Sequence, residues 1–91
     1  MTMNITAAEN AARTATLAEL IKGIPLCDDA EMVVRDGFDS LADNNPLGFY
    51  GAIDQSNDWD HIGGSFIEDV HRALRAVAIH FDRADLAEEV V

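Results

Sequence analysis

Residues 53–64, IDQSNDWDHIGG, concentrate the side chains that could do chemistry in this chain. The single tryptophan, Trp59, stands between Asp58 and Asp60, and Asp54 precedes it by a few residues. Alternating carboxylates are typical of calcium loops, whose oxygen ligands recur at every second position before a glycine. Three interpretations are open: a calcium loop, an aromatic anchor that holds a long loop to the core, or the aromatic centre of a surface that binds a cationic partner.

The calcium interpretation fits this stretch poorly. Counting an EF-hand loop from Asp54 puts Trp59 where the sixth position requires glycine. Counting from Asp58 puts Gly63 at that position, but Ile62 then replaces an oxygen ligand at the fifth. We therefore expect no metal ion here.

The histidines and the cysteine give no other site. His71 and His80 fall close to opposite faces of one predicted helix, so they cannot share an ion. His61 lies beside Asp60 without further ligands, and Cys27 has no histidine near it in the sequence. The chain also lacks a G-x-S-x-G motif and a glycine-rich phosphate loop followed by lysine. The sequence predicts a protein that is not an enzyme and has no catalytic residue and no cofactor.

Charge is the strongest feature of the composition. The net charge is −11, and residues 28–60 hold nine acidic side chains against Arg35 alone. Such a field repels nucleic acid phosphates and anionic lipid, so we expect no direct binding to nucleic acid or membrane. The same field attracts basic protein surfaces. Acidity can also serve solubility alone, which is the alternative explanation.

Helices must position these carboxylates, because the apolar residues recur with helical spacing. Three capping residues are followed three positions later by glutamate, which is typical of helix starts: Thr6 with Glu9, Asp28 with Glu31, and Ser65 with Glu68. We expect helices over residues 7–22, 29–42 and 66–81, a short helix over 47–55, and a short terminal helix after residue 82. A strand over residues 31–34 is the alternative for the second element.

The fold class that follows is all-α, a small bundle of four to five helices in one domain spanning residues 1–91. Gly37 falls inside the second helix and weakens it by about 1 kcal/mol relative to alanine, so packing must compensate or the helix must bend. The expected core consists of Leu17, Leu20, Ile21, Val34, Phe38, Leu41, Val70, Leu74, Val77 and Phe81.

The acidic middle of the chain is the predicted partner-binding site. Spaced carboxylates can imitate the phosphates of nucleic acid, which the arginines and lysines of a partner would then bind. An aromatic side chain, Trp59, Tyr50 or Phe49, would supply a desolvated anchor. The predicted site residues are Asp29, Asp36, Asp39 and Asp43 on the second helix, followed by Asp54, Asp58, Trp59 and Asp60.

Small size, strong acidity and the lack of a catalytic motif resemble the inhibitors that phages and mobile elements encode, notably anti-CRISPR and anti-restriction proteins, some of which are DNA mimics. The resemblance covers the whole chain by size and charge only, and it carries over no functional residue. It implies that the partner is a nucleic-acid-binding complex of a host defence system, whose basic groove would be blocked in the host cytoplasm.

A homodimeric structural or regulatory module is the competing interpretation. The alanine-rich first helix, or the tail formed by Val90 and Val91, would then make a two-fold interface. Residues 1–6 lack basic side chains and no long apolar run follows, so we expect no signal peptide, no membrane span and a cytoplasmic location.

Overall fold

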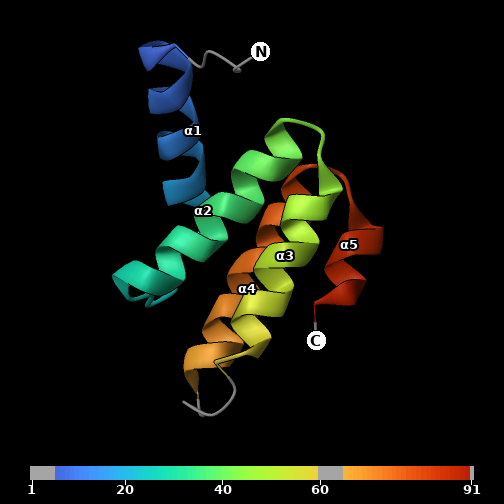
Figure 1. The fold of residues 1–91 in the computed structure, drawn as a ribbon. Helices are drawn as coiled ribbons and strands as arrows, with labels where there is room; N and C mark the ends of the chain where they lie inside the picture. The colour runs from blue at the N-terminus through green and yellow to red at the C-terminus, as the bar shows by residue number, and fades with distance from the viewer. Residues whose placement is uncertain (1–5, 60–64, 91) are drawn as a thin grey trace.

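The computed structural model describes residues 6–59 and 65–90, and over these ranges the chain is helical and contains no strand (Figure 1). The prediction of a small all-α bundle is confirmed, and the alternative of a strand over residues 31–34 is wrong because these residues lie inside the second helix. The helices are α1 (Ala7–Leu20), α2 (Asp28–Ala42), α3 (Pro46–Asn57), α4 (Ser65–His80) and α5 (Ala84–Glu89).

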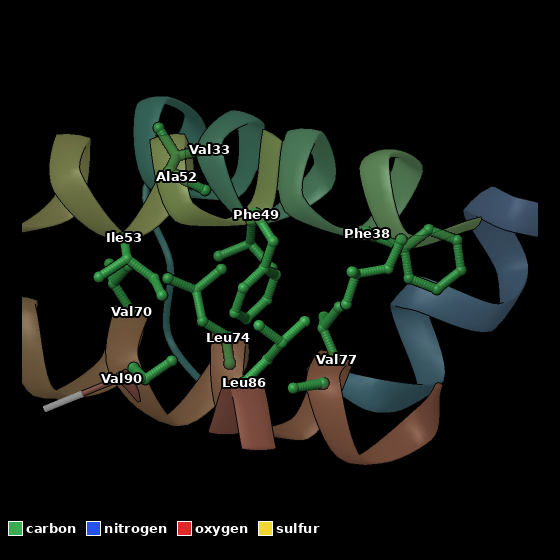
Figure 2. Packing of buried hydrophobic residues seen from close by; sticks show 14 of the residues in the cluster. Val33, Phe38, Phe49, Ala52, Ile53, Val70, Leu74, Val77, Leu86 and Val90 are labelled. Carbon is green, nitrogen blue, oxygen red and sulfur yellow. The ribbon is translucent and has the colours of Figure 1, made fainter. Parts of the chain in front are cut away.

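The helices form two layers around the core. α2 and α3 make one layer and α4 and α5 the other, and Figure 2 shows Phe49 and Ile53 of α3 pointing toward Val70 and Leu74 of α4. α1 stands beside α2, with its first turns away from α3, α4 and α5 (Figure 1). Its residues 7–12 are all exposed, and Leu17 is the residue of α1 that is buried.

The core contains most of the residues that the sequence predicts. Leu20 and Phe81 are only partly buried at its edge, whereas the other eight predicted residues are buried. Phe49 and Leu86 are fully buried and were not expected there. Val90 is also buried, at 4% exposure, so the prediction is wrong that Val90 contributes to a two-fold interface: it packs into the core of its own chain. Val91 lies outside the described residues.

The close approach of α2 to its neighbours explains why positions 37 and 48 are glycine. A Cβ atom on Gly37 would lie 3.2 Å from Cδ2 of Leu74 and 3.4 Å from Cδ1 of Phe49, so packing compensates for its low helix propensity. A Cβ atom on Gly48 would collide with the side chain of Ser40. The glycine thus lets α3 pass next to α2 directly after the turn that joins them.

The capping predictions have different outcomes. Thr6 and Glu9 form the expected reciprocal capping box. The prediction for Asp28 is wrong, because Cys27 occupies the N-cap without a side-chain hydrogen bond and Asp28 is the first helical residue. There Asp28 still interacts favourably with the positive end of the helix dipole. The side chain of Ser65 lies outside the described residues, so its predicted cap stays a prediction.

Candidate functional site

Four aspartates follow the outer surface of α2, as the sequence predicts. Asp29, Asp36 and Asp43 are spaced by seven residues, which is close to two helical turns and places them on one face. Asp39 lies on the same side, and the buried residues of α2 occupy the opposite side. We call Asp29, Asp36, Asp39 and Asp43 the acidic stripe.

One end of the acidic stripe is neutralised by arginines of the same chain. Nη2 of Arg13 in α1 donates to Oδ1 of Asp43 at 2.7 Å, and its Nη1 lies 3.6 Å from Oδ1 of Asp39. The hydrogen bond to Asp43 raises the pKa of Arg13, so the guanidinium stays charged. The carboxylates of Asp39 and Asp43 therefore contribute little to the field outside the molecule.

A second arginine completes this network. Nε of Arg35 donates to both carboxylate oxygens of Asp39, at 3.2 and 3.3 Å. Its Nη1 donates to Oγ1 of Thr14 at 3.1 Å, and its Nη2 donates to Oδ1 of Asn10 at 2.7 Å. We call these contacts, together with those of Arg13, the Arg13–Arg35 network. It ties the exposed first half of α1 to the middle of α2.

The other end of the acidic stripe faces solvent. Asp29 and Asp36 of the stripe are exposed, and so are the neighbouring Asp28 and Glu31. Within residues 6–59 and 65–90, none of the four forms an ion pair. The negative field of α2 is therefore concentrated on residues 28–36 and not spread over the whole stripe.

α3 adds further polar and apolar groups to the same layer. Asp54 and Asp58 are exposed, and Asp54 follows Tyr50, which is 41% exposed, by about one helical turn. Leu47, at 76% exposure, precedes Tyr50 by one helical turn. The suggestion that Phe49 anchors a partner is wrong, because its side chain is fully buried between the two layers.

The position of Trp59 favours one of the three interpretations of residues 53–64. Its side chain is half-buried and packs against the edge of the hydrophobic core, directly after the end of α3. This position fits the interpretation of an anchor that holds the following loop to the bundle. The predicted site residue Asp60 lies outside the described residues.

The described histidines occupy structural positions. Nε2 of His71, which is buried, is 3.1 Å from Oδ1 of Asn57 and so links α4 to the end of α3. The ring of His80 stacks on Phe38 and packs edge-on against Phe81. Across the described part of the chain, no three His, Cys, Asp or Glu side chains are placed to hold a metal ion.

The exposure of Met32 and the pairing of the arginines with the acidic stripe are not predicted from the sequence. Met32 is 65% exposed among the acidic residues of α2, although contact of its long apolar side chain with water is unfavourable. Its position between Asp28 and Asp36 on the polar side of the helix could have signalled this from the sequence. The pairing of Arg13 with Asp43 had no such signal, because thirty residues separate the two.

Comparisons with known proteins add no assignment. No family model matches the sequence. Neither the curated proteins nor the solved structures give a significant match. In the described helices, no segment has both the length and the apolar character needed to cross a membrane.

Proposed function

We propose that this protein is a non-enzymatic binding protein whose acidic surface docks on a basic surface of another protein. The observation that carries the proposal is a group of four exposed carboxylates in residues 28–36 of α2, Asp28, Asp29, Glu31 and Asp36, none of which forms an ion pair within the described residues. Carboxylates that serve only the stability of the fold are expected to have partners within the chain, as Asp39 and Asp43 do.

The distribution of charge supports the same conclusion. Residues 28–58, which include α2 and α3, hold eight acidic residues against Arg35, whereas residues 65–90, which include α4 and α5, hold six against three arginines. A charge asymmetry of this kind orients the molecule during its approach to a cationic partner and speeds association. Guanidinium groups of the partner can bind the exposed carboxylates in a bidentate manner.

The most specific form of the proposal is an anti-CRISPR-like inhibitor of a nucleic-acid-binding host defence complex, working in the host cytoplasm. Carboxylates repeated along a helix present negative charge to a groove that normally holds phosphates, so the protein would compete with nucleic acid as a DNA mimic. In this form the docking residues are Asp29, Asp36, Asp54 and Asp58, and Asp39 and Asp43 position α1 instead.

A matched pair of charge variants tests the proposal. One variant carries Asp29→Asn, Asp36→Asn and Asp54→Asn in the layer of α2 and α3. The control carries Glu68→Gln, Glu88→Gln and Glu89→Gln in the opposite layer, where the same charge is removed from exposed positions. Each protein is tagged, incubated with a lysate of the natural host, and the captured proteins are identified by mass spectrometry.

We expect wild type and control to retain a nucleic-acid-binding protein that the first variant loses. Added duplex DNA should displace that partner, because DNA and the acidic surface would compete for one basic groove. Equal capture by both variants, or capture that DNA does not affect, would contradict the DNA-mimic proposal.

A homodimeric module is the alternative function, and one observation favours it. Residues 7–12 of α1, including four alanines, are exposed along the whole helix surface, so a second copy could approach closely. Sedimentation at low and high salt separates the two functions. Docking through carboxylates weakens as salt rises, whereas association through an alanine surface does not.

A further inference from the structure

A groove separates α1 from the first half of α2. It has a volume of about 350 Å³ and is lined by Thr14, Leu17, Ala18 and Ile21 of α1 and by Glu31, Met32, Arg35 and Asp36 of α2. We call it the α1–α2 groove. Volumes of about 300–1,000 Å³ are typical of sites that take up ligand groups, so the groove has room for apolar side chains of a partner.

The floor of the α1–α2 groove is apolar. Leu17 and Ile21 form its base and are almost completely buried, at 4% and 9% exposure. Ala18 and Met32 stand at its sides and are exposed, Met32 at 65%. Covering Met32 would remove the exposed part of a large apolar side chain from water, which favours binding.

The rim of the groove is acidic. Glu31 and Asp36 flank Met32 and are exposed, and Asp28 lies one helical turn before Met32 on the same side. Arg35, the one cation among the lining residues, is engaged by Asp39, Thr14 and Asn10 through the Arg13–Arg35 network. Its guanidinium is therefore occupied by acceptors of the same chain, whereas Glu31 and Asp36 have no ion pair in the described residues, so the groove presents apolar surface bordered by unpaired negative charge.

We propose that the α1–α2 groove binds a cationic amphipathic helix of the partner protein, with apolar side chains on the floor and lysine or arginine side chains on the rim. Charge complementarity selects this occupant: a neutral apolar segment would leave the rim carboxylates without counter-charges, and a purely basic segment would leave Met32 in water. This inference rests on the proposed function and adds to it the place and chemical class of the docking segment.

Two labelled peptides of equal length and charge test the groove. The first has leucines at helical i, i+3, i+4 and i+7 positions and lysines elsewhere, and the second has serines in place of the leucines. Fluorescence anisotropy measures their affinity for the full chain. We expect the leucine–lysine peptide to bind at least about tenfold more tightly than the serine–lysine peptide, a difference of about 1.4 kcal/mol.

Three neutral substitutions locate the site. Met32→Gln replaces apolar surface of the groove with an amide, and Ala18→Gln places an amide over the groove, both without changing charge; Leu47→Gln removes an exposed leucine on α3, outside the groove. We expect Met32→Gln and Ala18→Gln each to weaken the leucine–lysine peptide roughly threefold to tenfold and to leave the serine–lysine peptide unchanged. Leu47→Gln should change neither affinity, and circular dichroism verifies that all three variants stay helical.

Other results would overturn the inference and separate it from the proposed function. If both peptides bind equally and Met32→Gln has no effect, the groove is not used, but docking through charge stands. If Leu47→Gln weakens binding and Met32→Gln does not, the apolar contact lies on α3 and the groove assignment is wrong. If neither peptide binds at low salt, the groove and the proposed acidic docking surface both fail.

Discussion

At the scale of single residues, the arginines decide which carboxylates are free to bind. Arg13 and Arg35 reach the same aspartate, Asp39, from two helices, and Arg13 also holds Asp43. Removing one partner leaves the other charge exposed to water at a modest cost, because both side chains retain some access to solvent. The Arg13–Arg35 network therefore orients α1 more than it stabilises the fold.

A double-mutant cycle measures this contribution. We expect Arg13→Gln and Asp43→Asn to be coupled by about 0.5–1 kcal/mol, since exposed ion pairs rarely exceed this range. The free energies of unfolding of wild type, both single variants and the double variant are obtained from urea titrations. The coupling should shrink in high salt. Strict additivity of the two substitutions would show that the pair does not act as a unit.

Asp85 makes a pH-dependent contribution at the start of α5. The side-chain hydrogen bond from Arg83 lowers the pKa of Asp85, with Nε and Nη2 of Arg83 each 3.0 Å from a carboxylate oxygen. A lowered folded-state pKa means that the stabilisation is present above the unfolded-state value of about 3.9 and is lost as pH falls through the folded-state value.

The predicted consequence is a stability difference between wild type and Asp85→Asn that is constant from pH 7 to pH 5 and disappears in acid. Urea midpoints of the two proteins at a series of pH values measure it. The variant Arg83→Gln should raise the pKa of Asp85 toward its ordinary value. A difference that persists at pH values below the folded-state pKa would contradict the assignment to the carboxylate.

At the scale of elements, two glycines of α3 with opposite surroundings give a matched test of helix packing. A Cβ atom on Gly48 collides with Ser40, whereas a Cβ atom on Gly51 meets nothing within 4 Å. We expect Gly51→Ala to stabilise the protein by about 0.8–1.0 kcal/mol through helix propensity. Gly48→Ala should instead destabilise it, because α3 must move away from α2.

Thermal or urea unfolding of the two variants gives the comparison. The sign of the change is the decisive result, because alanine brings the same propensity to both positions. Stabilisation by Gly48→Ala would show that α2 and α3 separate easily at their joined ends.

The elements were largely predictable, and their contacts were not. Helical periodicity and the Thr6 cap locate α1, α2 and α4 from the sequence, because local patterns determine where helices begin and end. Phe49 was not assigned to the core because Gly48 and Gly51 interrupt the apolar pattern around it. The pairing of Asp43 with Arg13 depends on how α1 crosses α2, which no local pattern contains.

At the scale of the whole molecule, the net charge of −11 opposes compaction. The molecule measures 37 × 24 × 23 Å, and at low salt the screening length of about 30 Å lets charges on all helices repel one another. At physiological salt the length falls to about 8 Å, so that only neighbouring charges interact. The relief of repulsion over the whole surface then outweighs the weakening of a few ion pairs.

We therefore expect the thermal midpoint to rise by several degrees when NaCl is increased from about 10 mM to about 150 mM. The variant with Asp29→Asn, Asp36→Asn and Asp54→Asn should show a smaller rise, since fewer charges remain to be screened. Melting curves followed by circular dichroism test both statements. A midpoint that falls with salt would show that ion pairs dominate the electrostatic energy.

The two halves of α1 are attached to the bundle by different kinds of contact. Its last turn inserts Leu17 into the core, but its first half is held by hydrogen bonds and ion pairs at the surface. The first half should consequently detach in brief local openings while the other helices stay folded, and its amide protons should exchange with solvent orders of magnitude faster than those of α4. Each such opening would widen one wall of the cleft beside Met32 and give an incoming helix a way in.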